Sequence, residues 1–138
     1  MTVASCATAP PPIRNETYKS YVLNQAGTST VGSPFFVNQD GRIETQREWV
    51  GLLFAPGGWK YSDRYSEDFV RQELLYGGRS GDTIEVSYRE FRRGLAAQAF
   101  TQSLKYDLKQ SKYIQFQRFQ IEILDANNQT ITSRVVRD

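Results

Sequence analysis

The segment Thr83-Ile84-Glu85-Val86-Ser87-Tyr88-Arg89 opens the part of the chain, Gly81 to Asp138, that decides the fold. Ile84, Val86 and Tyr88 alternate with polar residues. This period of two predicts a β-strand with one buried face and one face in water.

The same alternation returns further along the chain. In 100–108 the apolar residues are even-numbered, with Gln102 as the one polar exception, and 113–116 keeps that phase. From Phe119 onward the apolar residues are odd-numbered. A strand cannot change its buried face without a bulge or a turn, so we expect one at Gln117-Arg118. The C-terminal part is therefore predicted to be a β-meander that supplies most of the core.

The clearest predicted hairpin surrounds the polar run 125–129. The apolar residues on both sides are odd-numbered, so Ile123 is expected opposite Ile131, across a three-residue loop that ends at Asn128. Asparagine tolerates the left-handed conformation that such a loop needs at its end. A two-residue Asn-Asn turn, which would place Leu124 opposite Ile131, is the alternative.

Composition places the chain among single-domain β proteins. The 138 residues are 39% hydrophobic and 13% aromatic, and the eight Tyr and eight Phe favour sheet over helix. We predict an all-β fold: a single antiparallel β-sandwich or small β-barrel of about eight to ten strands, with little helix. The net charge is +2, without a basic cluster in either half, which argues against nucleic acid as a partner.

The residue inventory excludes several kinds of chemistry. The chain has no histidine and a single cysteine, Cys6. A Ser-His-Asp or Cys-His catalytic group, a histidine-based zinc site and a disulfide within the chain are therefore impossible. A metal would have to be a hard cation held by carboxylates, and we predict neither a metal nor a cofactor. No apolar run approaches the ~20 residues of a membrane-spanning helix.

The N-terminal segment indicates a lipid anchor. Val3-Ala4-Ser5-Cys6 fits the lipobox of bacterial lipoprotein precursors, and the small residues and prolines of 7–12 follow as an extended tether. The charged region and apolar run of a signal peptide do not precede the lipobox. Either Met1-Thr2 is an expression start on a trimmed sequence, or the match is accidental and the segment is a disordered tail with a spare thiol.

We favour lipidation of Cys6, with 1–14 as a flexible tether and 15–138 as a single β domain. An alanine, rather than an acidic residue, follows the cysteine. That residue suits delivery to the outer membrane, so we expect a lipid-anchored protein on its periplasmic face.

The most irregular and most aromatic stretch follows the loop 55–58. It contains the first candidates for a binding surface, which are Trp59, Tyr61, Tyr65 and Arg64. Aromatic residues beside flexible glycines and mixed charges suit recognition. In the alternative interpretation these aromatics plug the end of a sandwich or barrel.

Local signals predict further elements in the middle of the chain. Asp40-Gly41 is a strong hairpin signal, and the apolar run 49–54 is expected to be buried on both sides or at a corner. We predict a strand over 71–76, although Ser66 followed by acids is compatible with a short helix. The glycines of 77–82 lack the spacing of a phosphate-binding loop and are expected to permit positive φ in a strand connection.

Four segments carry a resemblance to known proteins. These are Leu74–Ile84, Tyr88-Arg89-Glu90-Phe91, Ala99–Gln102 and Lys105–Leu108. They resemble the C-terminal halves of a group of small bacterial lipoproteins with the pattern GxSGxTI…YREF…AFxQ…YDL. The resemblance covers roughly 30–137 and is strongest over 74–124. It implies an envelope location and a β fold, and no activity or catalytic residue.

At one position the chain departs from that group's pattern. Gln98 precedes Ala99, where the pattern has proline.

Three functions follow from these observations. The first is a non-enzymatic envelope lipoprotein, an accessory or interaction module for an unknown envelope protein, as a monomer or weak dimer. The second is a β-barrel that binds an apolar or sugar ligand among Trp59, Tyr61 and Tyr65, which a cavity of a few hundred Å³ would favour. The third is a hydrolase that uses the carboxylates Asp63, Glu67 and Asp68, two of which would have to face each other across a cleft.

Overall fold

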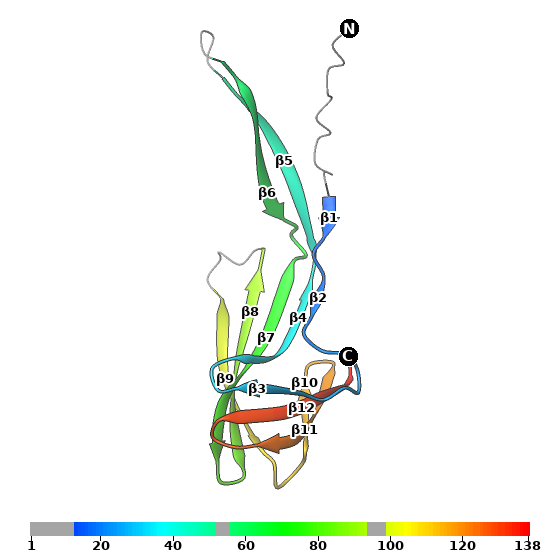
Figure 1. The fold of residues 1–138 in the computed structure, drawn as a ribbon, viewed down its shortest axis with the longest axis vertical. Coiled ribbons are helices and arrows are strands. Elements are labelled where there is room, and N and C mark those ends of the chain that lie inside the picture. Colours follow the sequence, from blue (N-terminus) through cyan, green and yellow to red (C-terminus); the bar gives the residue numbers. More distant parts are fainter. Residues whose placement is uncertain (1–12, 52–55, 94–98) are drawn as a thin grey trace.

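The computed structural model describes residues 13–51, 56–93 and 99–138. In this part of the chain the regular secondary structure consists of β-strands alone, and the strands form three antiparallel sheets (Figure 1). The strands are β1 Ile13–Asn15, β2 Tyr18–Lys19, β3 Gly27–Thr30, β4 Pro34–Asp40, β5 Arg42–Val50, β6 Gly58–Tyr65, β7 Val70–Ser80, β8 Thr83–Arg92, β9 Phe100–Asp107, β10 Tyr113–Phe116, β11 Phe119–Ala126 and β12 Thr130–Arg137. The predicted all-β fold is confirmed, with twelve strands in the described residues instead of eight to ten.

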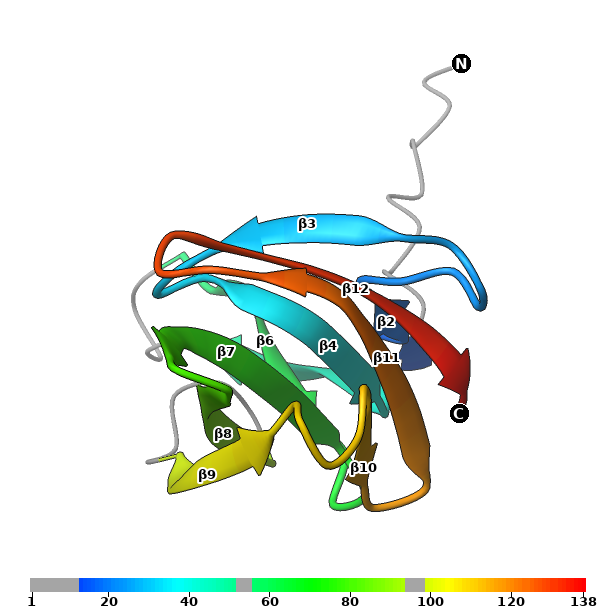
Figure 2. The same cartoon turned by 90° about the horizontal axis from the view of Figure 1, so that it is seen from below.

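The body of the molecule is a sandwich of two sheets and is not a closed barrel. One sheet has the order β2-β4-β7-β8-β9, and the other has the order β10-β11-β12-β3 (Figure 2). The core between them is apolar and comes mainly from β4, β7, β8 and the C-terminal strands. Its fully buried members include Phe36, Leu74, Tyr76, Ile84, Ile114, Phe119, Ile121 and Ile131. Burying each large apolar side chain contributes about 1.5–3 kcal/mol, so this layer is the main source of stability.

The predicted phases of the meander are confirmed. Ile84 and Val86 of β8 are at most 1% exposed. The phase changes where expected, because Phe116 pairs with Phe119 across a tight turn in which Gln117 has φ +49°. On both sides of the turn the apolar side chains consequently point into the sandwich. The partly buried strand β9 lies at the edge of its sheet, which explains why Phe100 remains 60% exposed.

The predicted register of the last hairpin is wrong. Ile123 pairs with Ser133, and Ala126 pairs with Ile131 after a bulge between Ile123 and Asp125. The side chain of Asn127 closes the loop, because its Oδ1 accepts hydrogen bonds from two backbone N–H groups of the following residues, at 2.8 and 2.9 Å. The bulge keeps the apolar residues of both strands on the inner face, which the pattern of alternation alone does not reveal.

The interpretation of the middle of the chain is confirmed in part. The segment 71–76 lies within β7, and positive φ occurs at Gly78 (+111°) and Gly81 (+59°) as expected. The predicted connection 77–82 is too long, because β7 continues to Ser80 through a bulge between Tyr76 and Gly78. Pro34 begins β4, as its lack of a backbone N–H predicts. The first strand β1 starts at Ile13, so regular structure begins inside the segment expected to be a tether.

The Asp40-Gly41 hairpin is not formed. β4 belongs to the sandwich, whereas β5 pairs with β1 and β6 in a third sheet of order β1-β5-β6. Asp40-Gly41 is a corner at which the chain leaves the body. β5 and β6 together extend away from the sandwich as a two-stranded projection, which we call the arm (Figure 1).

Candidate interaction arm

The root of the arm is fixed by a glycine and a phenylalanine. Gly41 has φ +145°, and a Cβ atom at this position would lie 2.7 Å from the Cα atom of Phe69. Phe69 is 1% exposed and its ring lies 4.6 Å from the ring of Tyr65 at the end of β6. Only a residue without a side chain permits this close approach, so the corner depends on glycine.

Hydrogen bonds between Arg42 and Ser66 close the root on its other side. The backbone N–H of Arg42 donates to Oγ of Ser66 at 3.0 Å, and the backbone N–H of Ser66 donates to the carbonyl of Arg42 at 2.9 Å. These contacts join the first residue of β5 to the residue after β6. The two strands are therefore held together where they leave the body.

The arm is an antiparallel ladder whose two faces differ in chemistry. The register pairs Ile43 with Tyr65 at the root and Trp49 with Trp59 near the far end. Odd-numbered residues share one face and even-numbered residues share the other, because side chains alternate along a strand. The odd face carries Trp49, Trp59, Tyr61 and Arg47 towards the far end and the polar pair Thr45–Asp63 nearer the root. The even face carries the pairs Glu48–Lys60, Gln46–Ser62 and Glu44–Arg64, with Val50 as its one exposed apolar residue. The arm is thus an amphipathic ribbon.

The two tryptophans form an exposed aromatic pair. Their ring centroids are 5.3 Å apart in an edge-to-face arrangement, and the guanidinium of Arg47 lies 4.7 Å from the ring of Trp59. Trp49 is 57% exposed, Trp59 is 50% exposed and the nearby Tyr61 is 45% exposed. A gathering of exposed aromatic residues on one face is typical of a surface that contacts another molecule.

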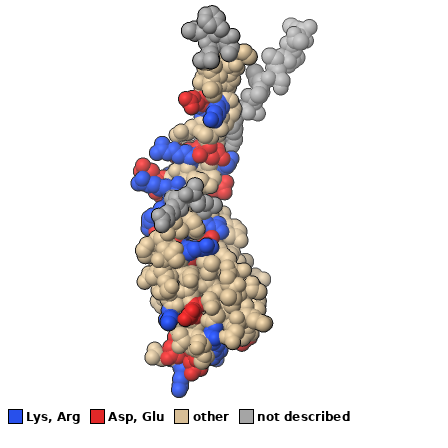
Figure 3. Space-filling view, turned by 90° about the vertical axis from the view of Figure 1, so that its left-hand side faces the viewer, with Lys and Arg blue, Asp and Glu red and all other residues tan. Residues whose placement is uncertain are grey.

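A charged contact attaches β1 to the arm. Nη2 of Arg14 in β1 lies 2.6 Å from Oδ2 of Asp63 in β6, so this pair spans the intervening strand β5. Thr45 of β5 also donates a hydrogen bond to Asp63, at 3.0 Å. Figure 3 shows that basic and acidic side chains intermingle along the arm, that few charges lie on the middle of the sandwich face below it, and that both signs occur again at the lower end. No single sign of charge dominates the arm.

The structure separates the four predicted binding residues. The stretch that contains them is expected to be irregular, but it is the regular strand β6, in which Trp59 and Tyr61 share the aromatic face of the arm. Tyr65 is half-buried against Phe69 and belongs to the root, and Arg64 lies on the opposite, polar face. Tyr65 packs on Phe69 outside the core cluster and the other two aromatics are exposed, so none of the three plugs the sandwich.

Trp49 is the main residue that the sequence analysis missed. The apolar run 49–54 is expected to be buried, but Trp49 and Val50 are more than half exposed, and 52–54 lie outside the described residues. Within the described residues, no second layer covers the aromatic face of the arm. The sequence offered one signal for this arrangement. If 42–48 is paired with 58–65 as a hairpin, Trp49 falls opposite Trp59.

The three acids of the hydrolase hypothesis have separate surroundings. Asp63 contacts Arg14 and Thr45 on the arm, whereas Asp68 lies 3.6 Å from Arg42 at the root. A hydrogen bond from Ser66, together with the charge of Arg42, lowers the pKa of Asp68. Glu67 is exposed. Asp63 and Asp68 thus contact different basic and hydroxyl side chains, and Glu67 faces solvent.

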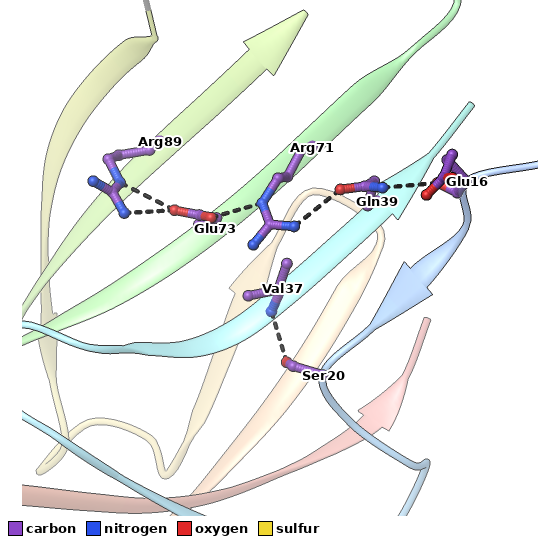
Figure 4. A network of polar contacts seen from close by, with 7 residues as sticks. All are labelled: Glu16, Ser20, Val37, Gln39, Arg71, Glu73 and Arg89. Atoms are coloured by element: carbon purple, nitrogen blue, oxygen red, sulfur yellow. Dashed lines mark hydrogen bonds and ion pairs between the residues drawn. The ribbon is translucent and has the colours of Figure 1, made fainter. Parts of the chain in front are cut away.

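A chain of polar contacts crosses the outer face of the five-stranded sheet (Figure 4). Arg89 and Arg71 both donate to the carboxylate of Glu73, Arg71 also donates to Oε1 of Gln39, and Gln39 donates to the carbonyl of Glu16 at 2.9 Å. This chain ties the segment after β1 to β4, β7 and β8. Sequence alternation alone does not predict it, because Glu73 is only 5% exposed on a face that would be expected to be in water.

A second polar cluster lies inside one end of the sandwich. Gln72 donates to Oε1 of Gln117 at 2.7 Å, and the hydroxyl of Tyr88 donates to Glu90. Burial and this hydrogen bond raise the pKa of Tyr88 to about 12. Within the described residues, every buried side-chain nitrogen or oxygen atom has a hydrogen-bond partner. The cluster is therefore complete without a ligand.

One cleft of about 400 Å³ lies between the 20–26 connection, β3, β12 and the start of β4. Tyr21, Phe35 and Arg134 are among its lining residues. Burial raises the pKa of Tyr21 to about 12, with the charge of Asp138 adding to the effect. None of the aromatics predicted to hold a ligand lines this cleft. The sandwich is not a closed barrel, so the architecture expected in the ligand-binding hypothesis is wrong.

The described residues include no group of three or more acidic or cysteine side chains placed to hold a metal ion. The same part of the chain contains no helix with the length and apolarity needed to cross a membrane. Cys6 lies outside it. Comparison with family models, curated proteins and solved structures gives no match to this chain.

Proposed function

We propose that this protein is a non-enzymatic interaction module of the bacterial cell envelope, anchored by lipid on Cys6 at the periplasmic face of the outer membrane. The arm is its contact surface. The observation that carries the proposal is the exposed pair of Trp49 and Trp59, at the far end of a ribbon whose other face is polar.

The construction of the arm supports a role in binding. Its root is joined to a well-packed sandwich through Gly41, Ser66 and Phe69, so the position of the arm follows that of the body. Its aromatic face is not needed for the core, which lies between the two other sheets. Such a projection adds exposed apolar surface, which lowers solubility unless another molecule covers it.

The lipid anchor is tested by intact mass and cell fractionation of the full-length gene product in a Gram-negative bacterium. We expect a mass gain of acyl-chain size and recovery with the outer membrane. A Cys6→Ala variant is expected to lose both. A soluble product without added mass in the parent protein would contradict the anchor.

The role of the arm is tested by photo-crosslinking in the same cells. A photoreactive residue at Tyr61 is compared with one at Tyr113, which is a similarly exposed aromatic residue on β10 of the sandwich. We expect crosslinked adducts, to protein or to lipid, from position 61 in excess over position 113. Equal yields at the two positions would remove the arm as the contact surface.

A further inference from the structure

The direction of β1 shows from which side the N-terminal segment reaches the body. β1 is antiparallel to β5, with Ile13 opposite Glu44 and Asn15 opposite Arg42. β5 runs from the root of the arm towards its far end, so β1 runs from the far-end side towards the root. The described chain therefore begins on the side of β5 that leads to the tryptophans. A straight continuation of β1 before Ile13 would lead an anchor towards that side.

The part of β5 between Glu44 and Trp49 and the segment between Cys6 and Ile13 have comparable lengths. Trp49 lies five residues beyond Glu44, or about 17 Å along the strand. Cys6 precedes Ile13 by seven residues, and a fully extended segment of that length spans at most about 25 Å. With the arm pointing at the membrane and Cys6 in it, the tryptophans stand within about 8 Å of the plane of the anchor, even at full extension of the tether. A shorter tether brings them into contact with it.

The residues at the far end suit the boundary between water and lipid. Tryptophan and tyrosine are enriched at membrane interfaces because their rings combine an apolar body with a polar edge. Arg47 and Lys60, on the same part of the arm, have apolar stems that can lie along lipid while their charges stay in water. Protein partners also select aromatic residues and arginine, but the direction of β1 favours lipid.

We propose that the Trp49–Trp59 end of the arm inserts into the interfacial region of the bilayer, as a second membrane contact beside the acyl chains on Cys6. The proposal rests on the proposed lipid anchor and names the partner of the arm. Two contacts hold a protein more firmly than one. They also fix its orientation, with the sandwich held away from the membrane and the end that carries β10 facing outwards.

The chain is well suited to a direct test, because it has one cysteine and two tryptophans, both on the arm. The full chain is coupled through the Cys6 thiol to maleimide-bearing phosphatidylethanolamine in vesicles of phosphatidylethanolamine and phosphatidylglycerol. Tryptophan emission is then recorded with and without brominated acyl chains. We expect a blue shift, protection from iodide in solution, and at least about a twofold loss of emission in brominated vesicles, because bromine quenches rings that reach the acyl boundary.

A matched variant moves the probe to the sandwich. In Trp49→Phe with Trp59→Phe and Tyr113→Trp, the single tryptophan is on β10, an exposed site at the other end of the molecule (Figure 1). The emission of this probe is expected to be unchanged by brominated vesicles and to remain quenched by iodide in solution. The single changes Trp49→Phe and Trp59→Phe are expected to keep the quenching, since the two rings face each other.

Two results would overturn the proposal. One is tryptophan emission from the arm with the same wavelength, and the same quenching by iodide, as in the uncoupled protein. The other is equal bromine quenching of the arm and β10 probes, which would mean that the whole surface adsorbs. Chemical coupling does not require lipidation in the cell, so failure of this test is distinct from failure of the lipid anchor, which intact mass reports.

Discussion

Glu73 and Arg89 lie directly opposite one another on β7 and β8, and Arg89 donates two hydrogen bonds, of 3.1 and 2.6 Å, to one oxygen of the Glu73 carboxylate. The other oxygen accepts from Arg71 at 2.7 Å. The side chain of Glu73 is 6% exposed, so its charge depends on these two cations rather than on water. The same contacts continue through Arg71 and Gln39 to the carbonyl of Glu16, in the segment that follows β1.

We expect Arg89→Met to lower the free energy of unfolding by about 2 kcal/mol, because a nearly buried carboxylate loses one of its two charged partners. Urea denaturation measures the change. The control is Lys105→Met, which removes the exposed pair of Lys105 and Glu85 on the neighbouring strands, 3.7 Å apart, and is expected to cost no more than about 0.5 kcal/mol. Similar losses in the two variants would show that Glu73 does not need Arg89.

The corner at the root of the arm depends on Gly41. We expect Gly41→Ala to destabilise the protein by about 2 kcal/mol, because it adds a methyl group against the backbone of Phe69 at a positive φ. Gly58→Ala is the matched control, since a Cβ at Gly58 would meet no atom within 4 Å. Thermal unfolding followed by circular dichroism compares them. A Gly41→Ala protein as stable as Gly58→Ala would mean that the root can rearrange.

The tryptophan pair is expected to contribute little to folding. We predict that Trp49→Ser with Trp59→Ser lowers the free energy of unfolding by about 1 kcal/mol or less, which is the scale of one exposed aromatic pair. Phe36→Ala removes a fully buried ring, which packs edge-to-face on Phe119 at 4.8 Å, and is expected to cost about 3–5 kcal/mol. Denaturation with urea provides both values. Comparable losses of stability in the two variants would show that the aromatic residues of the arm stabilise the fold. They would contradict the inference that these residues serve to contact another molecule.

The raised pKa values of two tyrosines predict a loss of stability at high pH. Tyr21 and Tyr88 ionise near pH 12 in the folded protein and near pH 10 in the unfolded chain. Between these values the folded state retains protons that the unfolded state has lost, so its stability is complete below about pH 10 and falls as the pH rises towards 12. Tyr21→Phe removes one ionising group, and its stability is expected to decline less steeply over that interval.

This alkaline effect is measured by urea denaturation at a series of pH values. Tyrosinate absorbance in the folded protein provides an independent titration of the same groups. Parallel declines in Tyr21→Phe and the parent protein would refute the contribution of Tyr21.

The strands of the sandwich are largely predictable because their signal is local. Alternation in 83–89 requires one wet and one dry face, and the change of phase after Phe116 requires a turn, whatever the rest of the chain does. The register of the last hairpin is not predictable in this way, since a bulge at Leu124 preserves the buried face while shifting every pair. The side chain of Asn127, which closes that loop, decides between turns that the apolar pattern permits equally.

The arm could be predicted only in part, because its position depends on contacts between distant residues. Asp40-Gly41 has the local sequence of a hairpin turn, yet Gly41 packs on Phe69 and directs the chain out of the sandwich. Hydrophobicity alone assigns Trp49 to a core. Whether a tryptophan is covered depends on whether a second layer lies over its strand, and no local pattern contains that information.

The sequence by itself determined the all-β class, the buried faces of the C-terminal strands, the exclusion of histidine-based chemistry and of a disulfide within the chain, and the aromatic character of 59–65. Each of these follows from residue type and from the period of two, which act within one strand. The tertiary structure decided that the strands divide into three sheets, that Trp49 meets Trp59 on an exposed face of the arm, and that Glu73 is buried between two arginines. These outcomes depend on which distant strands pair, because pairing sets which side chains another layer covers and which remain in water.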